Sequence, residues 1–429
     1  MPDLVIRGGT VVTPEAIRPA EVVVAAGRIC ALLPPGAPVQ AGETLDASGC
    51  LVLPGVIDAH VHFRTPGLTH KEDWPSASAA AVAGGVTTVL DMPNVLPATA
   101  SGQLLAAKAA LVAGRSRCHY GFYGALAAGG LEALPGLAQA GAIGFKVFLG
   151  ETTASLPPPD DGGLLAALAI TAGLGLRTMV HAENGAMLAA AAGAATHGAA
   201  HPAIAEVEAI RRICLLAAET GAGCCIAHCS TRGGCSAIRR AKEDGVDVRG
   251  EACPHHLLLT AAETAALGAL AQVNPPLRAP QDRAALWAAI ADGTIDQIGS
   301  DHAPHTQAEK ASSPAPSGFA GVQNTLAVLL GDGRLPLRRL VELVCEGPAR
   351  NWGLWPRKGL RAEGADADVA IVRPHPPAEA PRQWSLYPDS PVLRLCPARA
   401  EVVGTVVGGR LAFWGGVPVG PPLGRWVRP

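Results

Sequence analysis

The sequence predicts an α/β protein: a (β/α)8 barrel with a small β-sandwich formed by the N- and C-terminal segments. Three observations support this fold class. Between about residues 55 and 350, short apolar runs alternate with Ala- and Leu-rich helical stretches. Strand-like runs punctuated by Gly and Pro occupy both ends of the chain. The chain has 429 residues, 49% of them hydrophobic, which is enough for one large domain and a smaller one.

Both ends of the chain have the pattern of short β-strands. In the N-terminal segment, residues 1–54, the runs lie at 4–7, 10–12, 21–25 and 28–32. In the C-terminal segment, residues 356–429, the clearest runs lie at 368–372 and 401–407. Each segment is too short to bury a core by itself, so we expect the two to pair into one sandwich.

The middle of the chain, residues 55–355, is predicted to form the barrel. Eight strands are expected, at 56–60, 86–91, 117–123, 144–148, 176–180, 223–227, 247–251 and 295–300. Helical stretches separate them, for example 76–83, 103–113 and 205–220. Repeated βα units imply a parallel sheet, and eight of them fit a closed barrel, whose usual size is about 250 residues. An open, doubly wound sheet is the competing fold, but no GxGxxG or Walker-type loop follows the first strand.

Composition argues against two classes of partner and indicates a cellular compartment. The formal net charge is -2, aromatic residues make up 4%, and no basic run occurs, so nucleic-acid and anionic-membrane binding lack electrostatic support. We recognise neither a signal peptide nor an apolar stretch of about 18 residues. Eleven cysteines without an export signal indicate reduced thiols and a cytoplasmic protein.

Residues that bind metals or carry protons stand in or just after several of the predicted barrel strands. In a barrel the carboxyl ends of all strands meet on one face, where active sites form. These residues would therefore gather at one place although they span some 240 positions of sequence. They are His60, His62, Lys146, His181, His228 and Asp301.

Each of these residues also has an ordinary structural interpretation. A single histidine after a strand is most often a capping or core residue, but His60 and His62 are two apart and so face the same side of a strand. Lys146 lies in an apolar run where burying a charge is costly, unless it forms a buried salt bridge or extends to the surface. Asp301 could cap a helix. Taken together, the set favours a catalytic site over these alternatives.

The mixture of ligand types points to a binuclear metal centre. A lysine that reacts with CO2 becomes a carbamate, whose two oxygens can bridge two cations. Burial lowers the lysine pKa from about 10.4 and so supplies the neutral amine that this reaction requires. Imidazole and carboxylate ligands suit Zn2+ first, although manganese, iron and cobalt also fit. A metal lowers the pKa of bound water towards about 7, and Asp301 would pass the proton to a leaving nitrogen.

Several longer motifs carry a family resemblance. Over nearly its whole length the chain resembles the dihydroorotase branch of the cyclic amidohydrolases, within the amidohydrolase superfamily. The motifs are DAHVHFRTPGLTHKED at 58–73, GGVTTVLDMPN at 84–94, GFKVFLGET at 144–152, HAEN at 181–184, AHCSTRGG at 227–234, PHHLLLT at 254–260, VNPPLR at 273–278 and GSDHAPH at 299–305.

The resemblance implies roles for individual residues. His60, His62 and Asp301 would hold the first metal, His181 and His228 the second, and carboxylated Lys146 would bridge them, with Asp301 also catalytic. The substrate contacts would be Arg64, Asn94, Asn274, His305 and the backbone near Gly318. Arg64 and Asn94 would grip a substrate carboxylate, for which a guanidinium fork is suited. Alternatively, Arg64 forms an ion pair with Glu72 or Asp73, and Asn94 caps a turn.

The leading function is dihydroorotase, which interconverts (S)-dihydroorotate and N-carbamoyl-L-aspartate in de novo pyrimidine biosynthesis. The alternative is hydrolysis of allantoin, a hydantoin or a dihydropyrimidine, because residues 317–324 resemble the GxAGxQ stretch of allantoinases. The loop 150–155 resembles the substrate loop of lysine-bridged dihydroorotases, with Thr153 where an aromatic residue can stand.

A third alternative is an inactive partner of aspartate transcarbamoylase, but such a chain would lack metal ligands, which this chain retains. The resemblance further implies a homodimer or homotetramer, with aspartate transcarbamoylase as a possible partner.

Overall fold

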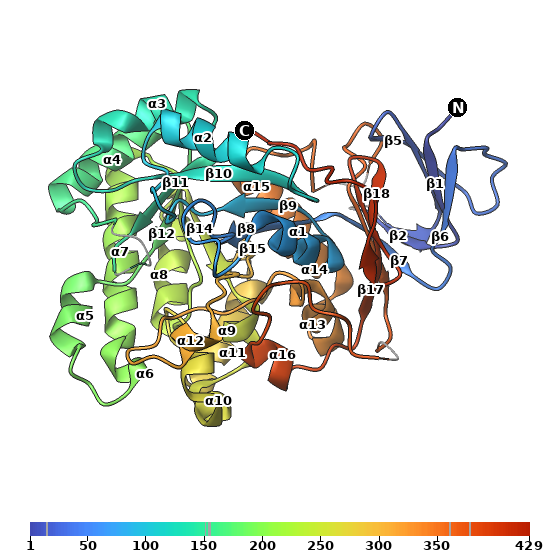
Figure 1. Cartoon of the computed structure of the whole chain (residues 1–429). Helices are drawn as coiled ribbons and strands as arrows, with labels where there is room; N and C mark the ends of the chain where they lie inside the picture. Colours follow the sequence, from blue (N-terminus) through green and yellow to red (C-terminus); the bar gives the residue numbers. More distant parts are fainter. Residues whose placement is uncertain (14–15, 151, 153–155, 360–361, 377–378) are drawn as a thin grey trace.

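The structure is a computed structural model, and it describes the whole chain except residues 14–15, 151, 153–155, 360–361 and 377–378. Figure 1 shows two parts side by side: a strand barrel surrounded by helices, and a pair of β-sheets that contains the N-terminal strands. The predicted α/β class, a (β/α)8 barrel with sheets built from the terminal segments, is confirmed.

Eight parallel strands form the barrel sheet, each paired with its neighbour in the chain. They are β8 (Val56–Val61), β9 (Val86–Asp91), β10 (His119–Ala125), β11 (Gly144–Phe148), β12 (Thr178–His181), β13 (Cys224–Ile226), β14 (Val248–Ala252) and β15 (Gln297–Ile298). Each overlaps one predicted strand, but β15 is shorter than the expected 295–300. The cause is local, because the amide of Ser300 donates to the side chain of Asp58 instead of to a backbone carbonyl.

The sheet closes just beyond β15. Val61 forms a parallel bridge with His302, and the amide of His62 donates to the carbonyl of His302 at 2.8 Å. The 3.1 Å hydrogen bond from the amide of Ser300 to Oδ1 of Asp58 ties the same two segments together. Closure therefore places the residues after the first strand beside those after the last, on the face where barrel active sites form.

Helices alternate with the strands and cover the outside of the barrel, which explains why β8 to β11 are buried along their whole length. Stretches 76–83, 103–113 and 205–220, predicted to be helical, belong to α1, α2 and α7. The helices of this region are α1 (Trp74–Ala83), α2 (Gly102–Val112), η1 (Leu131–Ala133), α3 (Leu134–Gln139), α4 (Asp161–Gly173), α5 (Gly185–Ala191), α6 (His197–Ala200), α7 (Ala203–Thr220), α8 (Arg232–Glu243), α9 (Pro254–Leu258), α10 (Ala261–Thr264), η2 (Ala265–Ala271), α11 (Pro280–Ala291), α12 (Gln307–Lys310), α13 (Thr325–Asp332), α14 (Leu337–Val341), η3 (Glu342–Glu346) and α15 (Gly347–Asn351).

The terminal segments build two sheets. A four-stranded sheet has the order β5-β4-β1-β6, with β1 (Leu4–Arg7), β4 (Glu21–Ala25), β5 (Arg28–Leu33) and β6 (Glu43–Asp46). A seven-stranded sheet has the order β19-β18-β17-β16-β7-β2-β3, with β2 (Thr10–Val12), β3 (Ile17–Pro19), β7 (Leu51–Pro54), β16 (Val369–Arg373), β17 (Glu401–Val407), β18 (Arg410–Trp414) and β19 (Val417–Pro418). Strand β7 joins the two ends of the chain, since it pairs with β2 and with β16.

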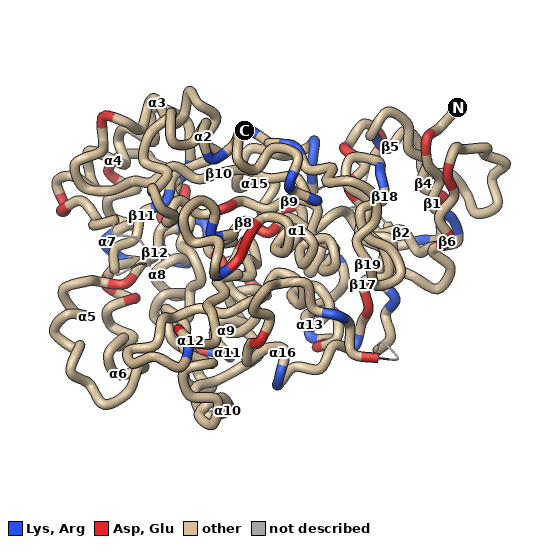
Figure 2. Tube along the Cα trace, viewed as in Figure 1, with Lys and Arg blue, Asp and Glu red and all other residues tan. Residues whose placement is uncertain are grey.

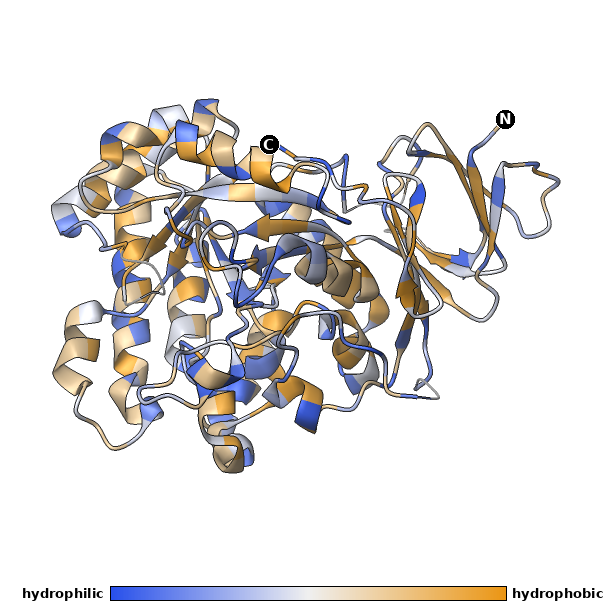
Figure 3. Cartoon of the chain, viewed as in Figure 1, coloured by the Kyte–Doolittle hydropathy of each residue, from blue (hydrophilic) through white to orange (hydrophobic). Residues whose placement is uncertain are grey.

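A separate hydrophobic core holds the two terminal sheets together. It includes Leu4, Val22, Val52, Val369 and Val406, all buried, and Figure 3 shows these strands as largely hydrophobic. These residues come from both ends of the chain, as expected for two segments that each lack enough apolar surface to fold alone.

The C-terminal segment also contacts the barrel. Trp426 bridges to Tyr120 of β10, and the amide of Val427 donates to the carbonyl of Tyr120 at 2.8 Å. Helix α16 (Pro391–Leu395) contributes Val392 to the core shared with the barrel. The last residues of the chain thus pair with barrel strand β10, near the C label in Figure 1.

Charged residues are distributed over the whole trace, with both signs mixed in each part of the molecule (Figure 2). Among the described residues, no helix combines the length and apolar character needed to cross a lipid bilayer.

Candidate functional site

His60, His62 and Asp301 form a buried cluster where the first and last barrel strands meet. The Nε2 atoms of His60 and His62 lie 3.3 Å and 3.2 Å from Oδ1 of Asp301. The three ligand-type atoms lie within 4.8 Å of one another. Burial would raise the pKa of Asp301, but the neighbouring imidazoles outweigh it and hold that pKa well below its ordinary value. The carboxylate is therefore ionised and can bind a cation.

The other nitrogen of each imidazole in this cluster has a hydrogen-bond partner. Nδ1 of His60 lies 2.6 Å from Oε1 of Glu251, and Nδ1 of His62 lies 2.8 Å from Oδ1 of Asn94. An amide oxygen and an ionised carboxylate only accept, so Nδ1 donates in both cases. Each Nε2 then faces Oδ1 of Asp301, and an imidazole whose Nδ1 is held by an acceptor while Nε2 faces the centre is the usual arrangement of metal-binding histidines.

His181, at the end of β12, and His228, just after β13, form a second pair. Nδ1 of His181 lies 3.0 Å from Nε2 of His228. Nε2 of His181 lies 3.0 Å from the Glu183 carboxylate, which leaves Nδ1 of His181 as an acceptor. Burial lowers the pKa of His228 well below its ordinary value, so its ring is neutral. Two imidazoles that converge in this way fit a second cation.

Lys146 lies in the middle of β11 and is fully buried. Its Nζ has no hydrogen-bond partner among the described residues and lies 5.0 Å from the centre of the Phe148 ring. Burial lowers the pKa of Lys146 to about 8, although Glu251 and Asp301 oppose the shift. A buried amine without a partner is costly. The chemistry of the amine and of the surrounding donors fits a carbamate between two divalent cations, and the salt bridge considered from sequence is not formed among the described residues.

A cavity of about 650 Å3 opens onto these side chains. Its walls include both imidazole pairs, Asp301 and several residues expected to contact substrate. The lining comprises His60, His62, Arg64, Asn94, Phe148, Thr152, His181, Ala192, His197, His201, His228, Gln272, Val273, Asn274, Asp301, Ala303, Pro314, Ala315, Pro316, Ser317 and Gly318.

Arg64 lies in the wall of this cavity and is 1% exposed. One guanidinium nitrogen lies 3.2 Å from the carbonyl of Pro304 and 3.3 Å from Nε2 of His305. Burial lowers the Arg64 pKa to about 10. Within the described part of the chain it forms no ion pair, so the predicted alternative of a salt bridge to Glu72 or Asp73 is wrong. Glu72 instead contacts His302, Ser76 and Ser385.

Comparison with known proteins identifies the family. The amidohydrolase family model matches residues 51–412. An allantoinase of Rubrobacter xylanophilus is 39% identical, over 100% of this chain and 98% of the relative. A dihydroorotase of Halobacterium salinarum is 38% identical, over 88% of this chain and 89% of the relative. The solved L-hydantoinase of Arthrobacter aurescens is 30% identical, with a TM-score of 0.92 over 100% of both chains.

The chain belongs to the amidohydrolase family. The prediction of a hydrolase that acts on cyclic amides is thereby confirmed. The finer expectation, dihydroorotase, has weaker support, because allantoinases are the more frequent names among the similar relatives.

The other substrate-contact residues predicted for this amidohydrolase lie in different settings. Asn94 already uses both ends of its amide, since Nδ2 donates to Oγ1 of Thr152 at 2.8 Å. Oδ1 of Asn274 accepts from Ser317 at 3.0 Å. Gly318 has φ 122, and a Cβ there would lie 2.6 Å from the carbonyl oxygen of Ala303, so glycine is required. All three line the cavity.

His305 lies outside that lining, behind Arg64. Its Nε2 lies 3.0 Å from the carbonyl of Ser317, and its Nδ1 lies 3.3 Å from Nζ of Lys71. In this structure His305 supports Arg64 rather than facing the cavity. Of the expected substrate loop 150–155, residues 151 and 153–155 lie outside the described residues, and Thr152 faces the cavity.

Sequence reasoning missed four residues around the site. Glu251 and Glu183 contact His60 and His181, and each stood in a strand or motif that we had singled out. Glu183 lies two residues after His181, and Glu251 is the last residue of the predicted strand 247–251, so these positions were the available signals. His197 and His201 line the cavity from α6 and the residue after it, and no pattern in the sequence marks them.

Proposed function

We propose that this amidohydrolase hydrolyses a cyclic ureide, with allantoin as the first candidate substrate. The single observation that supports the hydrolytic site is the convergence of two imidazole pairs, Asp301 and the unpartnered Lys146 in one cavity. The substrate class is supported by similarity to allantoinases along the full length of the chain. This choice replaces dihydroorotase as the leading function.

The proposed centre holds two divalent cations, with zinc as the first candidate. His60, His62 and Asp301 would bind one, His181 and His228 the other, and carboxylated Lys146 would bridge them. Such cations supply a water that is acidic enough to attack at neutral pH and polarise a carbonyl. Zinc and its common substitutes accept this combination of nitrogen and oxygen ligands.

The side chains perform the remaining steps. Asp301 is ionised and lies within the cavity wall, so it can accept a proton from the attacking water. It then delivers that proton to the ring nitrogen as the carbon–nitrogen bond breaks. Glu251, Asn94 and Glu183 hold three of the imidazoles in the tautomer and orientation required for binding.

Dihydroorotate is the second candidate, and Arg64 is the observation that favours it. A buried guanidinium without a carboxylate partner is energetically costly, typically by several kcal/mol per ion. The carboxylate of an acidic ring would supply that partner, because Arg64 opens into the cavity. Neutral rings such as allantoin lack this group.

A substrate panel tests the proposal. Purified protein would be stripped of metal with a chelator, reloaded with Zn2+ and bicarbonate, and offered allantoin, 5-substituted hydantoins and dihydroorotate. We expect hydrolysis only after reloading, with the highest kcat/KM for allantoin. A higher kcat/KM for dihydroorotate would transfer the assignment to the second candidate. Equal activity before and after stripping, or no turnover of any ring, would refute the proposed site.

A further inference from the structure

His228 differs from the other three imidazoles in how its ring is held. His60, His62 and His181 each have a side-chain partner on the nitrogen that faces away from the centre. Nδ1 of His228 is buried and has no partner among the described residues. The orientation of the His228 ring therefore depends on its backbone and on the 3.0 Å contact between its Nε2 and Nδ1 of His181.

That backbone is strained. His228 has φ 36, in the left-handed region that residues with a β-carbon seldom adopt. Such a conformation costs on the order of 1–3 kcal/mol and persists only where surrounding contacts impose it. The amide of His228 itself donates to Oε1 of Glu251 at 3.2 Å, and further contacts that could impose the conformation lie in the following segment, residues 229–231.

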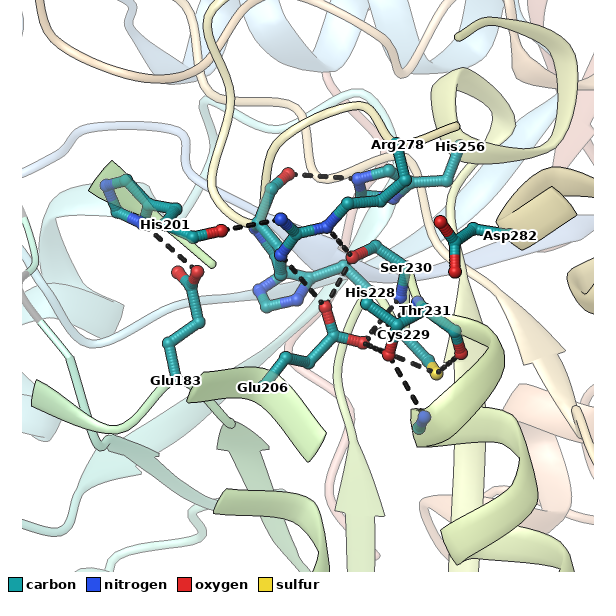
Figure 4. Close-up of polar contacts among 12 residues, drawn as sticks. Glu183, His201, Glu206, His228, Cys229, Ser230, Thr231, His256, Arg278 and Asp282 are labelled. Carbon is teal, nitrogen blue, oxygen red and sulfur yellow. Dashed lines mark hydrogen bonds and ion pairs between the residues drawn. The ribbon is translucent and has the colours of Figure 1, made fainter. Parts of the chain in front are cut away.

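Glu206 holds that segment. It reaches from α7 into the interior and is 1% exposed. Its Oε1 accepts from the amide of Ser230 at 2.9 Å, the amide of Thr231 at 3.1 Å and the Thr231 hydroxyl at 2.9 Å. Its Oε2 accepts from the Ser230 hydroxyl. One carboxylate thus fixes two consecutive residues just after the strained His228 (Figure 4).

Arg278 extends the network towards the other imidazole of the pair. Its guanidinium lies 3.5 Å from Oε2 of Glu206, donates to Oγ of Ser230 at 3.1 Å and donates to the carbonyl of His201 at 2.5 Å. The ring of His201 contacts Glu183 at 3.0 Å, and Glu183 also contacts His181. Figure 4 shows the Arg278 guanidinium between the His201 carbonyl, Ser230 and Glu206, with Glu183 beside the His201 ring. Among the described residues, neither Glu206 nor Arg278 forms a hydrogen bond or ion pair with His60, His62 or Asp301.

We propose that Glu206 and Arg278 are positioning residues for the second metal only: together with the contact from Glu251 to the His228 amide, they maintain the strained backbone that presents His228 to His181. The inference rests on the proposed two-metal centre. Replacing Glu206 with Gln places an amide NH2 among groups that are all donors, so at least one hydrogen bond is lost and the charge on Arg278 is left unbalanced. The segment would then relax, and the His228 ring would leave its partner.

The test is metal binding rather than turnover. Wild type, E206Q and R278K would be loaded with Zn2+ and bicarbonate, and metal content and affinity measured by elemental analysis and chelator competition. We expect wild type to hold two ions. E206Q should keep one tightly and bind the other roughly 10–100-fold more weakly, the usual effect of losing a group that orients a metal ligand. R278K should show a smaller effect in the same direction.

Two comparisons make the result specific. H228N removes a proposed ligand of the second metal and so shows the metal content expected when that ion is lost. If Glu206 acts only through His228, the double variant E206Q/H228N should bind no less metal than H228N alone. E263Q is the matched control, because Glu263 also pairs with an arginine, Arg283, at 2.9 Å and accepts from the amide and hydroxyl of Thr260, away from the centre. It should hold both metals as wild type does.

Retention of two metals with wild-type affinity in E206Q and R278K would overturn the proposal, as would an equal loss of both. If E206Q does not fold, as judged by circular dichroism, R278K decides the matter. A wild-type chain that binds two metals but hydrolyses no cyclic ureide would refute the proposed function and leave this inference standing.

Discussion

At the scale of single residues, the far nitrogen of each imidazole organises the candidate centre. Glu251, Asn94 and Glu183 accept hydrogen bonds from His60, His62 and His181, and this leaves the facing nitrogens free to bind cations. Asn94 was expected to grip a substrate carboxylate, but its oxygen is committed to His62. Asn94 lies three residues beyond the end of β9, where it can orient the His62 ring and still line the cavity.

Arg64 provides a prediction that separates the two candidate substrates. Arg64→Met removes the guanidinium but keeps a long, apolar side chain. For an acidic ring, loss of a buried charge partner costs at least about 2 kcal/mol, so KM should rise more than tenfold. For allantoin, which has no ring carboxylate, KM should change little. Steady-state kinetics with both substrates measures this difference, and an unchanged KM for dihydroorotate would exclude a carboxylate-binding role.

Lys146 provides a second prediction at this scale. Lys146→Ala should remove the bridging group and abolish both metal retention and hydrolysis. A short carboxylic acid such as acetate or propionate, which carries two oxygens like a carbamate, should restore part of the activity when zinc is present. Propylamine, of similar size but cationic, is the control and should restore nothing. Rescue by the amine rather than by the acid would contradict the proposed carboxylation of Lys146.

At the scale of elements, backbone strain gathers at the ends of the barrel strands. The non-glycine residues with positive φ in the described chain are Ala26, Arg64, His228 and Asp301, and the last three border the cavity. Arg64 follows β8, His228 follows β13 and Asp301 follows β15. Asp301 caps none of the helices in the described chain, because the next helix, α12, begins after its own cap, Thr306. The strand ends thus turn sharply to direct side chains into the cavity, at a cost in local stability.

Helix ends on the barrel surface make ordinary contributions to stability. Ser101 caps α2, and its hydroxyl accepts from the amide of Leu104 at 3.3 Å. Ser101→Ala should therefore destabilise the protein by about 1 kcal/mol, the typical cost of losing an N-cap. Urea denaturation measures the change, with Ser101→Asp as a control that keeps a capping oxygen. A loss of similar size in both variants would mean that the cap is not the cause.

At the scale of the whole molecule, a buried charge cluster links the terminal sheets to the barrel. Asp368, just before β16, lies 2.6 Å from Nζ of Lys358 and 3.4 Å from Nε2 of His119 on β10. Burial would raise the pKa of Asp368, but Lys358 and the contact with His119 outweigh it and hold the pKa well below its ordinary value. The folded protein therefore favours the ionised carboxylate.

This cluster predicts how stability depends on pH. Because the folded pKa of Asp368 is depressed, its contribution is fully present above the unfolded value of about 3.9 and is lost as pH falls towards the folded value. Asp368→Asn should cost about 3 kcal/mol at pH 7, the lower end of the range for breaking a buried pair. The gap in melting temperature between wild type and variant should narrow below about pH 4. A gap that widens in acid would contradict this assignment.

Much of the architecture could be predicted because it depends on local patterns. Alternating apolar and helical runs located all eight barrel strands, and the first two N-terminal strands were predicted with their observed bounds. Strand β7 was missed, since Leu51–Pro54 is a short run whose partners, β2 and β16, lie far away in the chain. The terminal sheets required tertiary structure to show which strands pair.

By itself, the sequence determined the βα alternation and the chemical types that stand at the strand ends, including His60, His62, Lys146, His181, His228 and Asp301. It could do so because strand periodicity and strand termini are local properties, and a barrel places all carboxyl ends on one face. Only the tertiary structure decided that Arg64 has no carboxylate partner among the described residues, that His305 contacts its guanidinium, and that Glu206 holds the segment after His228. These contacts join side chains that are far apart in the sequence and meet only when the barrel closes. The spacing of residues along the chain therefore cannot predict them.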